Sequence, residues 1–128
     1  MTRTNENWVE EIGKPTYDAI VEMVDALQQA TTDEEREAAE TAIHEDPLSV
    51  EVRSGWHVPG LTDNTPEEYN LLLGTGGPAT RIIGRLTDDG EPDTARLEVQ
   101  DWFKPWTEYT GADEQILLIY AQQFYFGE

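Results

Sequence analysis

The sequence predicts an α+β domain made of two N-terminal helices, a four-stranded antiparallel sheet and a C-terminal helix. Apolar residues recur at helical spacing near the start, alternate with polar residues in the middle, and return to helical spacing near the end. The 128 residues suit one domain with a single core. We expect residues 1–128 to form one acidic domain, with an acidic helical part over 1–46 and a sheet plus C-terminal helix over 47–128.

Two helices are predicted before residue 47. Gly-Lys-Pro at 13–15 is expected to end the polar start of the chain, and the first helix is expected from Tyr17 onward, where apolar residues follow the spacing i, i+3, i+4, i+7. Thr32 and Glu35 form a predicted capping box for a second helix over residues 33–44. Pro47 is expected to end that helix.

The second half of the chain has the pattern of a sheet. Alternation predicts strands over residues 48–53, 69–73, 80–86 and 94–100, with Asp-Asp-Gly at 88–90 as a hairpin turn. We expect the first strand to be half-buried. The aromatic segment 101–109, interrupted by a proline, is expected to be an ordered loop packed on the sheet. A last helix is expected over residues 112–124.

Charge dominates the composition, because 27 Asp and Glu stand against 8 Lys and Arg and give a net charge of −19. This sign disfavours direct contact with nucleic acid or with an anionic membrane, since both require a basic face. The absence of cysteine excludes disulfides, thiol catalysis and cysteine-ligated zinc. No apolar run suggests a signal peptide or a membrane span, so we expect a cytoplasmic protein.

Acidic side chains form rows on both predicted helices. On each helix, three acids follow the spacing i, i+4, i+7, which places them on one side. Like charges at such spacing cost about 0.2–0.5 kcal/mol per pair, so selection for stability alone would have placed lysines between them. The candidate partner-binding residues are Asp18, Glu22, Asp25, Asp33, Glu34, Glu37 and Glu40.

These rows have a charge density of the same order as that of a nucleic acid. Four residues of helix rise about 6 Å, and duplex DNA carries one phosphate per ~3.4 Å of axis on each strand. The pattern predicts a nucleic-acid mimic that occupies the basic groove of a DNA- or RNA-binding protein and is steered there by opposite fields.

Adaptation to high salt is the alternative explanation of the charge. Lys14 and Lys104 are the only lysines beside six arginines, as such adaptation would favour. An accessory or assembly protein of this kind would bind partners through apolar and aromatic surface, with charge serving solubility. Adaptation predicts acidic side chains spread evenly over the whole surface, whereas mimicry predicts that they gather in one patch.

Patterns for catalysis and metal binding are weak. His44 and His57 follow no metal-ligand spacing, and the acids of residues 88–93 lack the rest of a calcium-binding loop. The glycine-rich residues 74–80 lack the lysine of a phosphate-binding loop and precede a predicted strand, so we expect a tight turn. We therefore expect no enzyme, cofactor or metal, while a carboxylate pair assembled by the fold stays open.

Aromatic residues are interleaved with acids rather than with basic residues. This favours places in the core over base stacking, with an exposed minority as a protein-contact edge left as the alternative.

Four strings of residues resemble a group of largely uncharacterised small acidic proteins of phages, plasmids and integrated mobile elements: EDPLSVEVRSGW (45–56), LLLGTGGPATRI (71–82), LEVQDWFKPWTEY (97–109) and YAQQFYFGE (120–128). The likeness covers about residues 43–128. Proteins of this kind often disarm CRISPR or restriction systems, and several such inhibitors are acidic nucleic-acid mimics. The resemblance implies a counter-defence inhibitor that binds a basic nucleic-acid-binding protein or complex of the host, with no catalytic residue to carry over.

Overall fold

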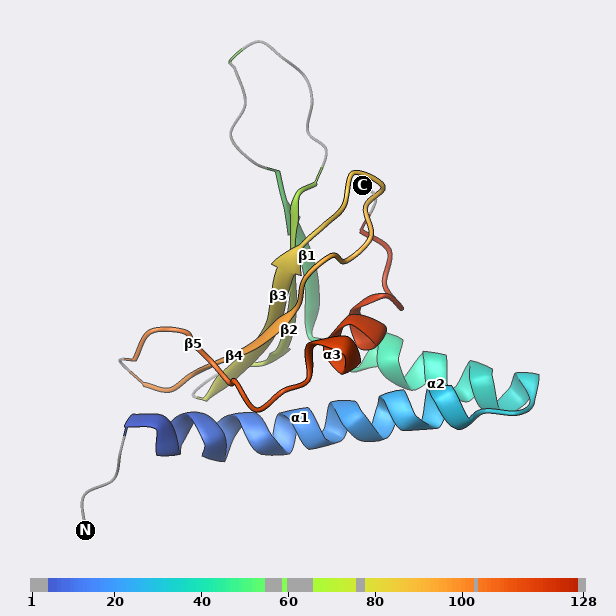
Figure 1. The fold of residues 1–128 in the computed structure, drawn as a ribbon, viewed down its shortest axis with the longest axis horizontal. Coiled ribbons are helices and arrows are strands. Elements are labelled where there is room, and N and C mark those ends of the chain that lie inside the picture. Colours follow the sequence, from blue (N-terminus) through green and yellow to red (C-terminus); the bar gives the residue numbers. More distant parts are fainter. Residues whose placement is uncertain (1–4, 55–58, 60–65, 76–77, 103, 127–128) are drawn as a thin grey trace.

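The computed structural model describes residues 5–54, 59, 66–75, 78–102 and 104–126. It has an antiparallel sheet and three helices among these residues, so the predicted α+β class and the order of the elements are confirmed. Figure 1 shows α1 and α2 side by side as a helical layer, with the sheet rising from it. The short helix α3 contacts both α1 and the sheet. The elements are α1 (Asn5–Gln29), α2 (Asp33–Glu45), β1 (Ser49–Arg53), β2 (Glu68–Gly74), β3 (Ala79–Arg85), β4 (Arg96–Gln100), β5 (Thr107–Glu108) and α3 (Glu114–Ala121).

The strands form an antiparallel meander in the order β1-β2-β3-β4-β5. The fifth strand, β5, lies inside the segment that we expected to be a loop. It pairs with the end of β4, and the Tyr109 N–H donates to the Leu97 carbonyl at 2.8 Å. Two residues are too few to produce an alternating pattern, so the sequence carried no signal for this strand.

The start of α1 was predicted wrongly. The helix runs continuously from Asn5 to Gln29. It passes through Gly13 and Pro15, which we expected to separate the polar start of the chain from the first helix. An interior proline removes a backbone hydrogen bond and crowds the preceding turn. Packing outweighs that cost, because Val9 and Gly13 are buried on the side of α1 that faces the rest of the protein.

The core lies between the inner face of the sheet and the helices. Leu71, Ile82 and Leu97 face one another across β2, β3 and β4, and all three are fully buried. The helices cover this face, with buried residues from all three of them. These are Ile20, Val24, Ile43, Leu117, Tyr120 and Ala121.

Two buried tyrosines join separate parts of the fold through their hydroxyl groups. The Tyr69 hydroxyl donates to the Thr94 carbonyl at 2.6 Å, and the Tyr120 hydroxyl donates to the Asp46 carboxylate at 2.6 Å. Burial raises the pKa of both phenols, so they remain neutral donors at ordinary pH. Phe126 packs on Tyr69, which returns the C-terminal segment to the sheet.

Local capping signals are confirmed. The Thr32–Glu35 capping box begins α2, and α2 ends at Glu45 before Pro47. Hydrogen bonds from Thr31 and Thr32 lower the pKa of the Glu35 carboxyl. The turn at 88–90 is also present, with Gly90 at a φ of 82° that favours glycine.

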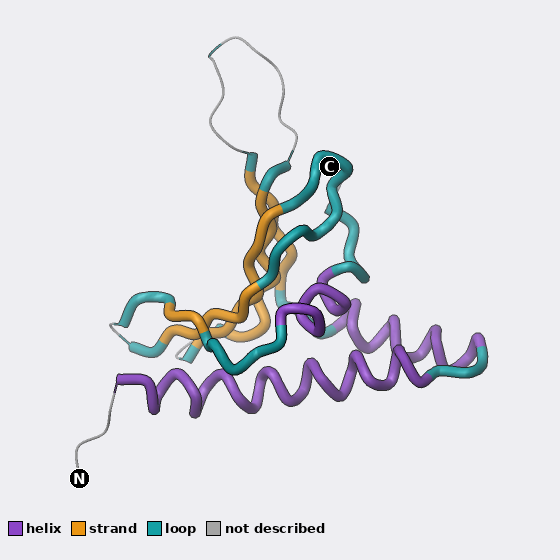
Figure 2. The backbone as a smooth tube through the Cα atoms, in the orientation of Figure 1, coloured by secondary structure: helices purple, strands orange, loops and turns teal. Residues whose placement is uncertain are grey.

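β1 is an edge strand, and its apolar side chains are more exposed than predicted. Leu48, Val50 and Val52 are 60%, 44% and 38% exposed. The register places Val50 opposite buried Leu71, so these side chains lie on the inner side of the sheet. Figure 2 shows the strands rising away from the helical layer.

We expect Gly13→Ala to lower the free energy of unfolding by about 1–3 kcal/mol through overpacking. The added Cβ would lie 2.6 Å from the Tyr109 Cγ. In an open helical position the same change would raise stability by roughly 0.5–1 kcal/mol. Urea denaturation measures the difference. Gln28→Ala, at an exposed position of α1, is the control and should change stability by no more than about 0.5 kcal/mol. Equal or greater stability of Gly13→Ala would contradict the close packing.

Candidate partner-binding surface

The predicted acidic row of α1 lies on its solvent side. Asp18, Glu22 and Asp25 are all exposed, while Ile20 is buried on the opposite side of the helix. Lys14 Nζ lies 3.1 Å from the Asp18 carboxylate, and both side chains are more than half exposed. Such a pair contributes little to stability, but it neutralises one charge of the row. Glu22 and Asp25 have no ion pair within the described part of the chain.

The predicted acids of α2 divide into two groups. Asp33, Glu34 and Glu37 are exposed, whereas Glu40 is partly buried. The capping box occupies Glu35, so its carboxylate is less available to a partner. Since α1 and α2 pack side by side, their acids belong to one helical layer.

The helical layer is the most acidic part of the chain, although acids also occur elsewhere. Residues 1–46 carry 13 acids and three basic residues, and the other 82 residues carry 14 acids and five basic residues. The turn between β3 and β4 alone contributes four exposed acids. These are Asp88, Asp89, Glu91 and Asp93.

Four of the six arginines lie on the outer face of the sheet. Alternate residues of a strand point to opposite faces, and the register places these four on the side opposite the buried core. They are Arg53, Arg81, Arg85 and Arg96. The sequence does not reveal this cluster, because the arginines are scattered along three strands and only the register brings them together.

Glu98 is the centre of this arginine face. Arg81 Nη2 lies 2.7 Å from one Glu98 carboxylate oxygen, and Arg96 Nε lies 2.7 Å from the other. The Glu98 side chain is only 10% exposed, and the Arg81 guanidinium stacks 4.1 Å from the Trp106 ring centroid. Burial alone would raise the pKa of Glu98, but the hydrogen bonds from Arg96 and Arg81 outweigh burial and hold that pKa below its usual value.

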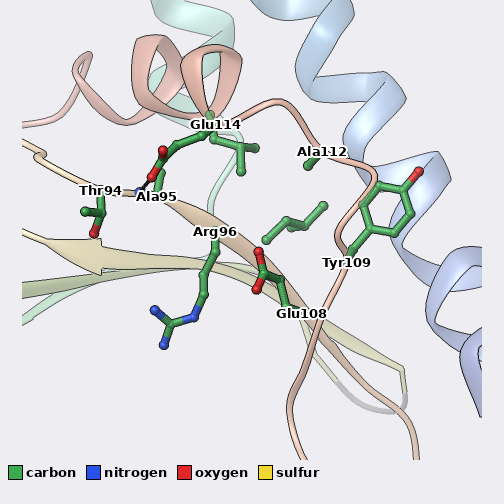
Figure 3. A pocket seen from close by; sticks show the side chains of 9 residues that line it. Thr94, Ala95, Arg96, Glu108, Tyr109, Ala112 and Glu114 are labelled. Carbon is green, nitrogen blue, oxygen red and sulfur yellow. Dashed lines mark hydrogen bonds between the residues drawn. The ribbon is translucent and has the colours of Figure 1, made fainter.

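A cavity of about 260 Å³ lies between β4, β5 and the start of α3 (Figure 3). The Glu114 carboxylate accepts a hydrogen bond from the Ala95 N–H at 3.1 Å, and Arg96 is held by Glu98. Glu108 lies on a different side of the cavity from Glu114 in Figure 3. The carboxylates that line it thus do not converge as an acid–base pair would require.

The remaining candidate features have structural roles or lie outside the described residues. His44 Nε2 donates to the Gln123 carbonyl at 2.6 Å and links α2 to the segment after α3, while His57 is outside the described residues. Within the described ranges, no group of three or more potential ligands could hold a metal ion. None of the described helices is long and apolar enough to cross a membrane.

Aromatic side chains are divided between core and surface. Tyr69, Tyr120 and Phe126 are buried, whereas Trp102 and Tyr125 are 67% and 80% exposed. The exposed pair lies outside the helical layer, so it does not extend the acidic rows.

Comparisons of the chain with models of known protein families, with curated proteins and with solved structures gave no match.

We expect Glu98→Gln to lower the free energy of unfolding by about 1–3 kcal/mol at pH 7, because two arginines would lose their shared anionic partner. The pKa of Glu98 is lower in the folded chain than its usual 4.5. The stabilisation is therefore present above pH 4.5 and is lost as the pH falls through the folded pKa. Urea unfolding measures the free energy of unfolding of the variant and of the wild type at pH 7 and pH 3. The difference between the two proteins should be smaller at pH 3.

Glu68→Gln provides the matched control. Its partner Arg53 is 71% exposed, so losing this ion pair should cost no more than about 1 kcal/mol. Equal losses in the two variants, or a loss for Glu98→Gln that does not depend on pH, would contradict the role given to Glu98.

Proposed function

We propose that this chain is a binding protein that uses the acidic surface of α1 and α2 to occupy a basic, nucleic-acid-binding surface of another protein. The observation that carries the proposal is the exposed acidic row of α1, with Glu22 and Asp25 unpaired among the described residues. A protein selected only for stability would place basic residues beside these acids. Here four arginines lie on the opposite, outer side of the sheet instead.

The shape of the helical layer supports mimicry of a nucleic acid. α1 has 25 residues and extends about 37 Å at ~1.5 Å per residue. One turn of duplex DNA is about 34–36 Å long. A rigid helix of this length presents carboxylates along a basic groove without ordering a flexible segment on binding, which reduces the entropic cost.

The separation of charge within the molecule supports an oriented encounter. The excess of acids is densest in the helical layer, and four arginines lie on the far side of the sheet. A basic partner would attract the helical layer more strongly than the outer face of the sheet, where Glu68 and Glu98 already pair with arginines. The field would therefore orient the protein before contact.

Counter-defence is the biological role that we propose for this binding. CRISPR complexes hold nucleic acid in positively charged channels, and such a channel is a suitable target for a row of carboxylates. In this role the chain acts in the host cytoplasm as an anti-CRISPR or anti-restriction inhibitor, and it needs no catalytic step and no cofactor.

Charge reversal of the α1 row tests the mechanism. The partner is first captured from host lysate, and inhibition of its DNA binding is then titrated at 50 and 200 mM salt. Replacing Asp18, Glu22 and Asp25 with lysine should weaken inhibition at least tenfold, about 1.4 kcal/mol. For the wild type, inhibition should be weaker at 200 mM salt.

The matched control reverses Asp88, Asp89 and Glu91 at the turn between β3 and β4, which changes the net charge equally. Its inhibition should stay within threefold of wild type. Equal losses in the two variants would show that only net charge matters. Unchanged inhibition by the α1 variant would show that the acidic row of α1 does not contact the partner.

Salt adaptation remains a second candidate because the turn acids are also exposed. In that case acidity serves solubility, and partners bind apolar or aromatic surface. An even coat of charge predicts a rise in melting temperature of roughly 10 °C or more from 0.1 to 2 M KCl, corresponding to a few kcal/mol. The two triple variants should then reduce this rise equally. If the acids instead form a patch on the helical layer, the α1 variant should reduce the rise in melting temperature more than the turn variant does.

A further inference from the structure

The open edge of β1 presents unpaired backbone groups. β1 is the first strand of the meander, with a neighbour on one side only among the described strands. The Leu86 N–H donates to the Glu67 carbonyl, so in β2 the backbone N–H and C=O groups of odd-numbered residues point toward β3. Those of even-numbered residues therefore point toward β1. Since the even-numbered residues of β2 pair with the odd-numbered residues of β1, Val50 and Val52 turn their N–H and C=O groups toward the open edge.

The side chains of this edge leave it open to another strand. Leu48, Val50 and Val52 form an apolar stripe that is 60%, 44% and 38% exposed. Sheet edges are commonly blocked by lysine, proline or a bulge, and the sequence of β1, SVEVR, contains neither lysine nor proline. An uncovered apolar stripe beside unpaired backbone groups is a template for strand addition.

The charges of β1 indicate what pairs with it. Glu51 and Arg53 lie on the outer face, on either side of Val52. If a second copy pairs antiparallel about Val52, each Glu51 lies directly opposite Arg53 of the other copy. Opposite charges in this position stabilise a strand pair, whereas pairing centred on Glu51 would place like charges together.

We infer that two copies of this chain associate through their β1 strands, antiparallel and centred on Val52, so that their sheets continue into one. Val52 of each copy then forms the central hydrogen-bonded pair, and the Glu51–Arg53 pairs occupy non-hydrogen-bonded positions, where side chains lie closest. Arg53 already contacts Glu68 at 2.6 Å, but it is 71% exposed and has room for a second carboxylate.

The association is expected to be weak. Pairing centred on Val52 overlaps the two β1 strands only over residues 51–53, which buries less than a standard interface of about 1,600 Å², and each copy carries a net charge of −19. We therefore expect weak, concentration-dependent dimerisation that is best observed in 0.5 M NaCl, where long-range repulsion is screened. This inference does not depend on the proposed function, because it uses a different surface.

Sedimentation equilibrium from 10 to 500 µM in 0.5 M NaCl tests the pairing. Wild type should dimerise, and Glu51→Arg and Arg53→Glu should each weaken dimerisation at least tenfold by placing like charges opposite each other. An equimolar mixture of the two variants should restore a dimer, because one β1 then carries two arginines and the other two glutamates. Glu22→Arg and Arg36→Glu make the same charge changes at exposed helix positions and should stay within threefold of wild type.

Single cysteines test the register, since the chain has none of its own. A central pair of residues has Cα atoms about 5.5 Å apart, within the ~4.4–6.8 Å that a disulfide spans. Val52→Cys should therefore form a covalent dimer on oxidation, while Val50→Cys should not. A wild type that stays monomeric at 500 µM overturns the inference, as does preferential cross-linking at Val50 or a mixture that fails to dimerise.

Discussion

Repulsion among 27 carboxylates, opposed by only 8 basic side chains, is the constraint on which the rest of this fold depends. Apart from Glu40, which is partly buried, the described acids of α1, α2 and the turn before β4 are exposed to solvent, where water screens them. Glu98 differs from them because it is nearly buried between two arginines. Stability must come from the apolar core and its tyrosine hydrogen bonds, because most of the surface charge opposes the compact state.

Local signals in the sequence were sufficient for most elements. The Thr32–Glu35 capping box and the alternating strands depend on neighbouring residues, and both are confirmed. The start of α1 and the presence of β5 depend on tertiary contacts. Gly13 remains helical because Tyr109, almost a hundred residues later, packs directly on it. The uncovered edge at β1 could not be predicted either, because alternation identifies which side chains share a face but not what covers that face.

The candidate surface was predicted in part. The acids of α1 and α2 followed from helical spacing, and the structure exposes all of the predicted ones except Glu40, which is partly buried. The arginine face required the register of three strand pairs, which the sequence does not specify. Its presence changes the interpretation of the charge, because the chain has one side rich in acids and another where acids and arginines are paired.

The most direct measurement is mass-spectrometric footprinting of carboxylates, free and in complex with the captured partner. Carbodiimide coupling labels exposed acids, and the position of each label is read from peptides. Binding through the helical layer predicts that Glu22, Asp25 and Glu37 lose labelling in the complex while Asp88 and Asp89 keep it. Protection confined to the sheet, with the helical acids labelled as in the free protein, would contradict the account.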